Sequence, residues 1–88
     1  MAWFTRAALL HGEMHPLSVG RVAVYFVSNP ELDDEPVRAE LVVAPMGESE
    51  RRETLRVGER FVIGPQTWVL EDVENVGTYD YIVRIAAV

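Results

Sequence analysis

The chain has 88 residues and a net charge of −6, and 49% of its residues are apolar while 25% are charged. This length predicts a single domain over residues 1–88, and this balance of residue types excludes a disordered chain. Cysteine is absent, which excludes disulfides and thiolate metal sites. Acidic residues outnumber basic ones by 14 to 8, which argues against nucleic acid as a partner.

No apolar run approaches the ~18 residues that a membrane-spanning helix needs, so we expect no membrane partner. The opening residues, MAWFTRAALLHGEM, have no basic residue before the first apolar ones and no long apolar segment, unlike a secretory leader. We therefore interpret them as the beginning of a first strand in a cytoplasmic protein.

Apolar residues occur in short bursts separated by turn formers, without helical spacing, and this pattern predicts strands. The first strand is expected over residues 2–11, and GEMHPLSVG at 12–20 is expected to reverse the chain. The next, RVAVYFVS at 21–28, is apolar on both faces, which is typical of a central or doubly covered strand. Alternation assigns its residues to two faces: Val22, Val24 and Phe26 on one, and Ala23, Tyr25 and Val27 on the other.

Residues 29–36, NPELDDEP, predict a solvated loop because prolines and like charges disfavour a central strand. Strands are expected at 37–44 and at 50–57. The first of these has one apolar face: Val37, Ala39, Leu41 and Val43. The second alternates, with Arg52, Thr54 and Arg56 outward and Leu55 and Val57 inward, so its outer face should lie in water.

The stretch LRVGERFVIGPQTWVL at 55–70 predicts two turns around a short strand at 60–63. Gly58 and the pair Gly64–Pro65 suit turns because Gly adopts positive φ and Pro fixes φ near −65°. A long strand follows over 67–76, in which Val73 and Val76 break the parity of Trp68 and Leu70. A bulge near Glu71–Asp72 would reconcile the two patterns.

A last strand is expected over residues 79–88, with one apolar face made by Tyr79, Tyr81, Val83, Ile85 and Ala87. The sequence therefore predicts an all-β fold of about seven mostly antiparallel strands. A sheet of this size twists and closes, so the fold should be a small antiparallel barrel or a two-layer sandwich.

The C-terminal half resembles a family of short, uncharacterised actinobacterial all-β proteins, a domain of unknown function. Ten residues match its pattern: Thr54, Leu55, Val57, Gly58, Phe61, Ile63, Gly64, Thr67, Trp68 and Leu70. The chain contains no Lys, which is compatible with an actinobacterial origin, because a GC-rich genome favours Arg and Ala codons over Lys codons. The resemblance brings no catalytic residue, cofactor or ligand with it.

Two clusters have metal-binding chemistry. His11, Glu13 and His15 in HGEMH could converge on a metal, although Gly12 and Pro16 oppose the helix that pairs such histidines. The acids Glu31, Asp33, Asp34 and Glu35 could hold Ca²⁺ but lack the EF-hand spacing. We favour solvated turn histidines and a soluble acidic loop, and we assign no metal and no cofactor.

Two functions remain in competition. In the first, Trp68, Glu71, Asp72, Tyr79 and Tyr81 line a pocket of a small β-barrel enzyme or ligand-binding protein for an apolar metabolite. A carboxylate in such an apolar setting gains a raised pKa and acts as a general acid or base. That function needs a cavity of ~300 Å³ holding a buried carboxylate.

In the second, which we favour, the chain is a non-enzymatic binding or accessory protein. Trp3 and Phe4 are adjacent and point in opposite directions in a strand, and Tyr25 lies on a strand that is apolar on both faces. Their outward apolar surface would contact a protein partner or a second copy in a homo-oligomer. That contact should bury ~600 Å² or more per protomer.

Overall fold

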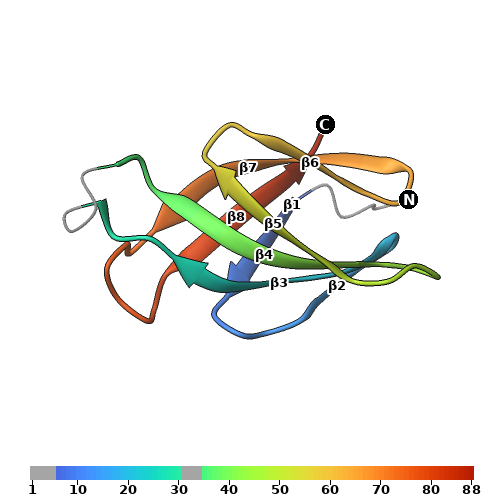
Figure 1. Ribbon diagram of the computed structural model, residues 1–88, viewed down its shortest axis with the longest axis horizontal. Helices are drawn as coiled ribbons and strands as arrows, with labels where there is room; N and C mark the ends of the chain where they lie inside the picture. The colour runs from blue at the N-terminus through green and yellow to red at the C-terminus, as the bar shows by residue number, and fades with distance from the viewer. Residues whose placement is uncertain (1–5, 31–34) are drawn as a thin grey trace.

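A computed structural model describes residues 6–30 and 35–88 of the chain, which form two four-stranded antiparallel sheets (Figure 1). The predicted all-β class is thereby confirmed, in its two-layer form. The described residues contain eight strands, against about seven expected. Within them, no helix is long and apolar enough to cross a membrane.

The first sheet, sheet A, consists in spatial order of β1 (Arg6–Leu10), β8 (Ile82–Ala87), β7 (Gln66–Glu74) and β6 (Arg60–Ile63). The second, sheet B, consists of β2 (His15–Leu17), β3 (Gly20–Val27), β4 (Arg38–Pro45) and β5 (Arg51–Arg56). Neighbouring strands follow one another along the chain except in the β1–β8 pair, which joins the first described strand to the last.

The additional strand is β2, which lies inside the segment 12–20 that was expected only to reverse the chain. It pairs with β3 from His15 opposite Val22 to Leu17 opposite Gly20. β2 is an edge strand, and Pro16 at its centre is tolerated there because an edge can dispense with one N–H donor. β3 is consequently a central strand, as its two apolar faces indicated.

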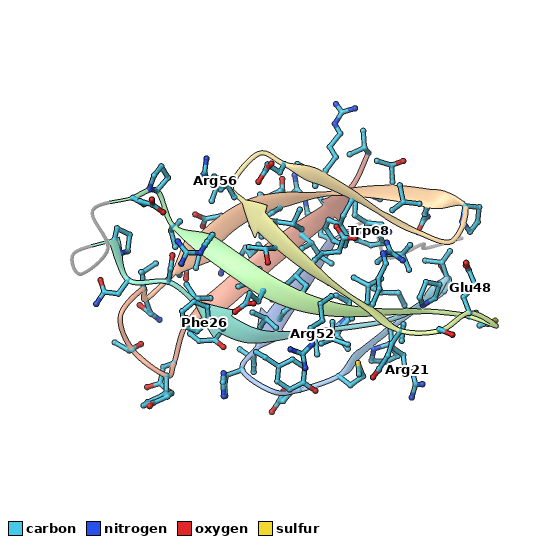
Figure 2. The ribbon with its side chains drawn as sticks, viewed as in Figure 1. Arg21, Phe26, Glu48, Arg52, Arg56 and Trp68 are labelled. Carbon is cyan, nitrogen blue, oxygen red and sulfur yellow. The ribbon has the colours of Figure 1, made fainter. Side chains whose placement is uncertain are left out.

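The core is the layer of inward side chains between the two sheets, and Trp68 is its largest fully buried member (Figure 2). The indole Nε1–H of Trp68 donates to Gln66 Oε1 at 3.1 Å, so its polar atom is satisfied. Gly58 and Gly64 lie in turns with φ of 93° and 57°. The interpretation of 55–70 as turns around a short strand is therefore confirmed.

Two bulges shift the strand registers. The bulge expected in β7 is present between Leu70 and Asp72. A second bulge, which alternation did not predict, lies in β3 between Val24 and Phe26. Because it inserts one residue, Val27 packs against the core while Tyr25 and Phe26 are 48% and 44% exposed. The assignment of Phe26 to the face of Val22 and Val24 was therefore wrong.

Two strand ends also differ from expectation. Val57 was expected to point inward but is exposed, because β5 ends at Arg56 and Val57 belongs to the following turn. β8 begins at Ile82, so Tyr79 lies in the turn before the strand and not on its apolar face.

Gly20, at the start of β3, is predicted to be the least replaceable glycine of the sheet. A Cβ there would lie 2.8 Å from Pro45 Cα and closer still to the Ala44 carbonyl oxygen, at a φ of +152°. Gly20→Ala should lower the free energy of unfolding by about 2–4 kcal/mol, measured by urea denaturation. Gly47→Ala is the matched control because a Cβ there meets nothing within 4 Å. Its loss should be about 1 kcal/mol, from positive φ alone, and equal losses in the two variants would contradict the prediction.

Candidate functional site

An aromatic hollow of about 360 Å³ is lined by residues of β3 and of the loop between β7 and β8. These two segments lie together at one end of the sandwich (Figure 1). The lining of the hollow comes from β3, from this loop and from the end of β1: His11, Tyr25, Phe26, Val27, Asn29, Gly77, Thr78, Tyr79 and Tyr81. We call these nine residues the aromatic hollow. It draws from both sheets, so it exists only when the two layers are packed together.

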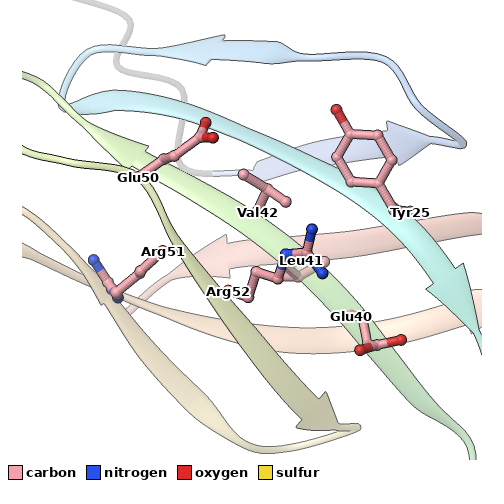
Figure 3. A pocket seen from close by; sticks show the side chains of 7 residues that line it. All are labelled: Tyr25, Glu40, Leu41, Val42, Glu50, Arg51 and Arg52. Atoms are coloured by element: carbon pink, nitrogen blue, oxygen red, sulfur yellow. The ribbon is translucent and has the colours of Figure 1, made fainter.

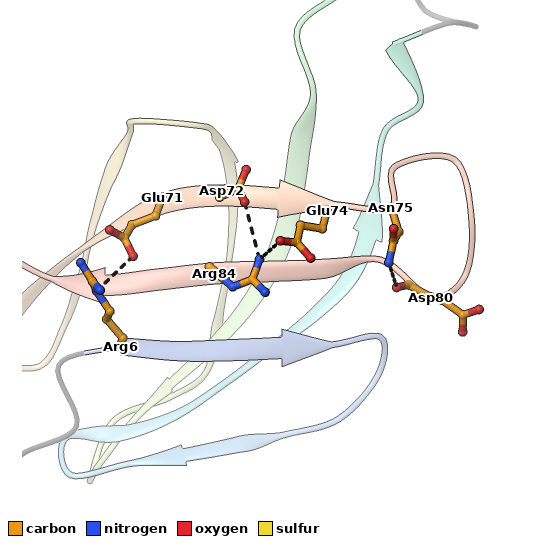
Figure 4. A network of polar contacts seen from close by, with 7 residues as sticks. All are labelled: Arg6, Glu71, Asp72, Glu74, Asn75, Asp80 and Arg84. Atoms are coloured by element: carbon orange, nitrogen blue, oxygen red, sulfur yellow. Dashed lines mark hydrogen bonds and ion pairs between the residues drawn. The ribbon is translucent and has the colours of Figure 1, made fainter.

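The β7–β8 loop is held in shape by its own hydrogen bonds. Thr78 Oγ1 donates to the Asn75 carbonyl at 2.9 Å and accepts from the Asp80 N–H at 3.1 Å. Asn75 Nδ2 donates to the Asp80 carbonyl at 3.3 Å (Figure 4). Gly77 has a φ of 90°, and a Cβ at this position would lie 3.3 Å from Asn29 Nδ2. The loop therefore has a defined shape that leaves the Tyr79 side chain 86% exposed.

Tyr81 forms the buried floor of the aromatic hollow. Its hydroxyl shares a hydrogen bond with His11 Nδ1, and the two rings meet edge to face with centroids 5.4 Å apart. The Tyr79 ring makes a second edge-to-face contact with the His11 ring, and their centroids are 6.1 Å apart. Burial raises the pKa of the Tyr81 phenol above its ordinary value because the charged form is poorly solvated there.

A second hollow of about 410 Å³ lies on the outer surface of sheet B (Figure 3). It is lined by Tyr25, Glu40, Leu41, Val42, Glu50, Arg51 and Arg52. Tyr25 belongs to both hollows, because its place at the β3 bulge exposes it between the end of the sandwich and its flat face. Tyr25 therefore lies at the centre of the candidate site.

Of the five residues proposed to line a metabolite pocket, the structure brings only Tyr79 and Tyr81 together. Trp68 is fully buried in the core. Glu71 and Asp72 are exposed on sheet A, where each forms an ion pair (Figure 4). Glu71 Oε1 lies 3.5 Å from Arg6 Nε, and Asp72 Oδ2 lies 3.6 Å from Arg84 Nη1. Arg84 donates a hydrogen bond to Glu74, and this bond raises the pKa of the Arg84 guanidinium. Arg84 therefore keeps its positive charge.

Among residues 6–30 and 35–88, the one buried polar or charged residue is Ser28, whose Oγ accepts the Arg38 N–H at 2.9 Å. This part of the chain thus holds no buried carboxylate of the kind that acid–base chemistry on an apolar metabolite requires. Trp3 and Phe4, two of the three residues proposed for partner binding, lie outside the described residues. The third, Tyr25, is at the surface.

The described part of the chain also contains no group of three His, Asp or Glu residues placed to hold a metal ion. His11 is engaged with Tyr81, away from the arrangement with Glu13 and His15 that a metal site would need. In the acidic loop, Glu35 pairs with Arg38 at 3.2 Å. The other three acids of that loop, at positions 31, 33 and 34, fall outside the described residues.

Two ring-bearing residues of the aromatic hollow, Phe26 and His11, were not predicted as site residues. Phe26 was assigned to the face of Val22 and Val24 because nothing in the apolar run RVAVYFVS marks the bulge. His11 was considered only with His15, its neighbour in sequence, whereas its ring partners lie 68 and 70 residues along the chain at Tyr79 and Tyr81. Comparisons of the chain with protein-family models, curated proteins and solved structures gave no match.

The buried phenol of Tyr81 predicts a loss of stability in alkali. Its pKa is higher in the folded protein than in the unfolded chain, so the folded state retains the proton longer and stability falls as pH rises above about 10. Ultraviolet absorbance of phenolate against pH should show one tyrosine ionising at a higher pH than the others. Tyr81→Phe should remove this high-pH step. Tyr79→Phe is the control, since it should leave the high-pH step in place. A high-pH step that survives in Tyr81→Phe would contradict this assignment.

Proposed function

We propose that this chain is a non-enzymatic binding or accessory protein that acts through protein–protein contact, with a protein partner or with itself, at a surface centred on Tyr25. The observation that carries the proposal is the exposure of three aromatic side chains in one region: Tyr25, Phe26 and Tyr79. A cytoplasmic location and the resemblance to actinobacterial proteins remain predictions and add no activity to the proposal.

Exposed aromatic residues support a contact surface because of their energetics. Burying a large aromatic side chain is worth about 1.5–3 kcal/mol, and a Tyr loses little conformational entropy when it is immobilised. Aromatic residues are accordingly enriched at the centres of protein interfaces. Here two of the three come from adjacent positions on a central strand and the third from an internally hydrogen-bonded loop, so their backbones are held in place before any partner arrives.

A small apolar ligand is the second candidate occupant of this surface. The aromatic hollow is within the size range of small-molecule pockets, and Tyr79 and Tyr81 are among the residues that line it. Its lining contains no carboxylate, so the general acid or base that the metabolite hypothesis assigned to Glu71 or Asp72 is not part of it. Binding of a ligand would make the same residues a recognition site.

The proposal is tested by a photoreactive amino acid placed at Tyr25. Irradiation in cells that express the chain should give a discrete covalent adduct with one protein, identified by mass spectrometry, because Tyr25 lies at the centre of the contact. Val62, which is 50% exposed on β6 of sheet A, is the matched control position and should give no such adduct. Absence of any adduct specific to position 25 would refute the proposal.

A further inference from the structure

The two outer surfaces of the sandwich differ in how many of their charged side chains form ion pairs within the chain. On sheet A, Arg6 pairs with Glu71 at 3.5 Å, and Arg84 pairs with Glu74 at 2.6 Å and with Asp72 at 3.6 Å (Figure 4). On sheet B, five charged side chains lie exposed without an ion pair among the described residues: Arg21, Glu40, Glu50, Arg52 and Arg56. On sheet A, Arg60 is exposed and unpaired within the same residues. The outer surface of sheet B therefore presents both signs of charge, uncompensated within the chain.

The strand registers place these charges around an apolar centre. Val42 of β4 lies between Ala23 of β3 and Arg52 of β5 in one row across the sheet. In the next row, Glu40 lies between Phe26 and Thr54. Tyr25 flanks this centre on the β3 side, and Arg52 and Glu50 flank it on the β5 side (Figure 3). We call this surface face B.

We propose that face B binds a second copy of this chain, face to face, about a two-fold axis close to Val42. This inference rests on the proposed function and names its partner. If residue i of one copy contacts residue j of the other in a two-fold dimer, then residue j of the first copy contacts residue i of the second. Each pairing therefore occurs twice. An axis close to Val42 brings Arg52 of each copy onto Glu40 of the other.

Charge complementarity favours a second copy over an unrelated partner of one sign. A strongly acidic partner would meet Glu40 and Glu50, and a strongly basic one would meet Arg21 and Arg52, and like charges brought together at an interface oppose binding. A surface carrying both signs around an apolar centre suits its own copy.

The experiment measures the mass of the purified chain by sedimentation velocity over a concentration series from about 1 µM to 1 mM, which spans the affinities of weak dimers. The wild-type chain should form a dimer within this range. Arg52→Glu and Glu40→Arg should each weaken the dimer at least about tenfold, because each places like charges together twice. Arg60→Glu makes the same charge change at an exposed position of sheet A and should leave the dimer unchanged.

Mixing the two variants provides the decisive arm. In a heterodimer of Arg52→Glu with Glu40→Arg, both contacts again join opposite charges, so an equimolar mixture should recover the wild-type dimer. The double variant R52E/E40R should recover it as well. Circular dichroism of each variant checks that it is folded. Recovery of the dimer in the mixture and in the double variant then reports the charge pairing itself, separately from any loss of stability in the single variants.

Three outcomes overturn the second copy on face B: a monomer throughout the range, a dimer that both single substitutions leave intact, or single variants that dissociate and are not rescued by mixing. A monomeric chain whose residue 25 still crosslinks to a different protein overturns this inference alone and leaves the proposed function standing. A dimer with mixing rescue, in which residue 25 of one copy crosslinks to the other copy, supports both the second copy on face B and the proposed function.

Discussion

The apolar layer shared by the two sheets is the constraint on which the rest of the structure depends. Each strand gives alternate residues to this layer, and Trp68, Leu70, Ile63 and Leu9 are fully buried within it. The same layer draws the first described strand beside the last, because Leu9 and Val83, which face each other in the β1–β8 pair, are both fully buried. A domain of this size has one such layer, so its demands decide which side of every strand meets water.

The two bulges show how the core shapes the surface. In β7, the inserted residue places Glu71 and Asp72 both outside and returns Val73 to the core. In β3, the same device returns Val27 to the core and leaves two aromatic side chains exposed. One bulge thus creates an acidic stretch that Arg6 and Arg84 neutralise, whereas the other creates the aromatic surface where recognition is proposed.

The contrast between the outer surfaces of the sheets concerns specificity more than stability. Solvent screens exposed ion pairs, so the Arg84 cluster on sheet A adds little to folding. It does leave most charges of that surface paired, with Arg60 as an exposed exception among the described residues. Arg52 and Glu40 on sheet B gain nothing from each other inside one chain, and their charges remain available to orient a neighbour. The aromatic hollow and face B meet at Tyr25, which belongs to both.

The sequence by itself determined the all-β class, the turns at Gly58 and Gly64–Pro65 and the bulge of β7, because Gly and Pro restrict φ locally and a break in alternation is visible along one strand. Only the tertiary structure decided the two-layer closure, the β1–β8 pair and the bulge of β3. A strand that is apolar on both faces carries no record of a one-residue insertion, since either parity is acceptable in sequence. The meeting of His11 with Tyr79 and Tyr81 likewise arises from packing between segments about 70 residues apart, which no local pattern encodes.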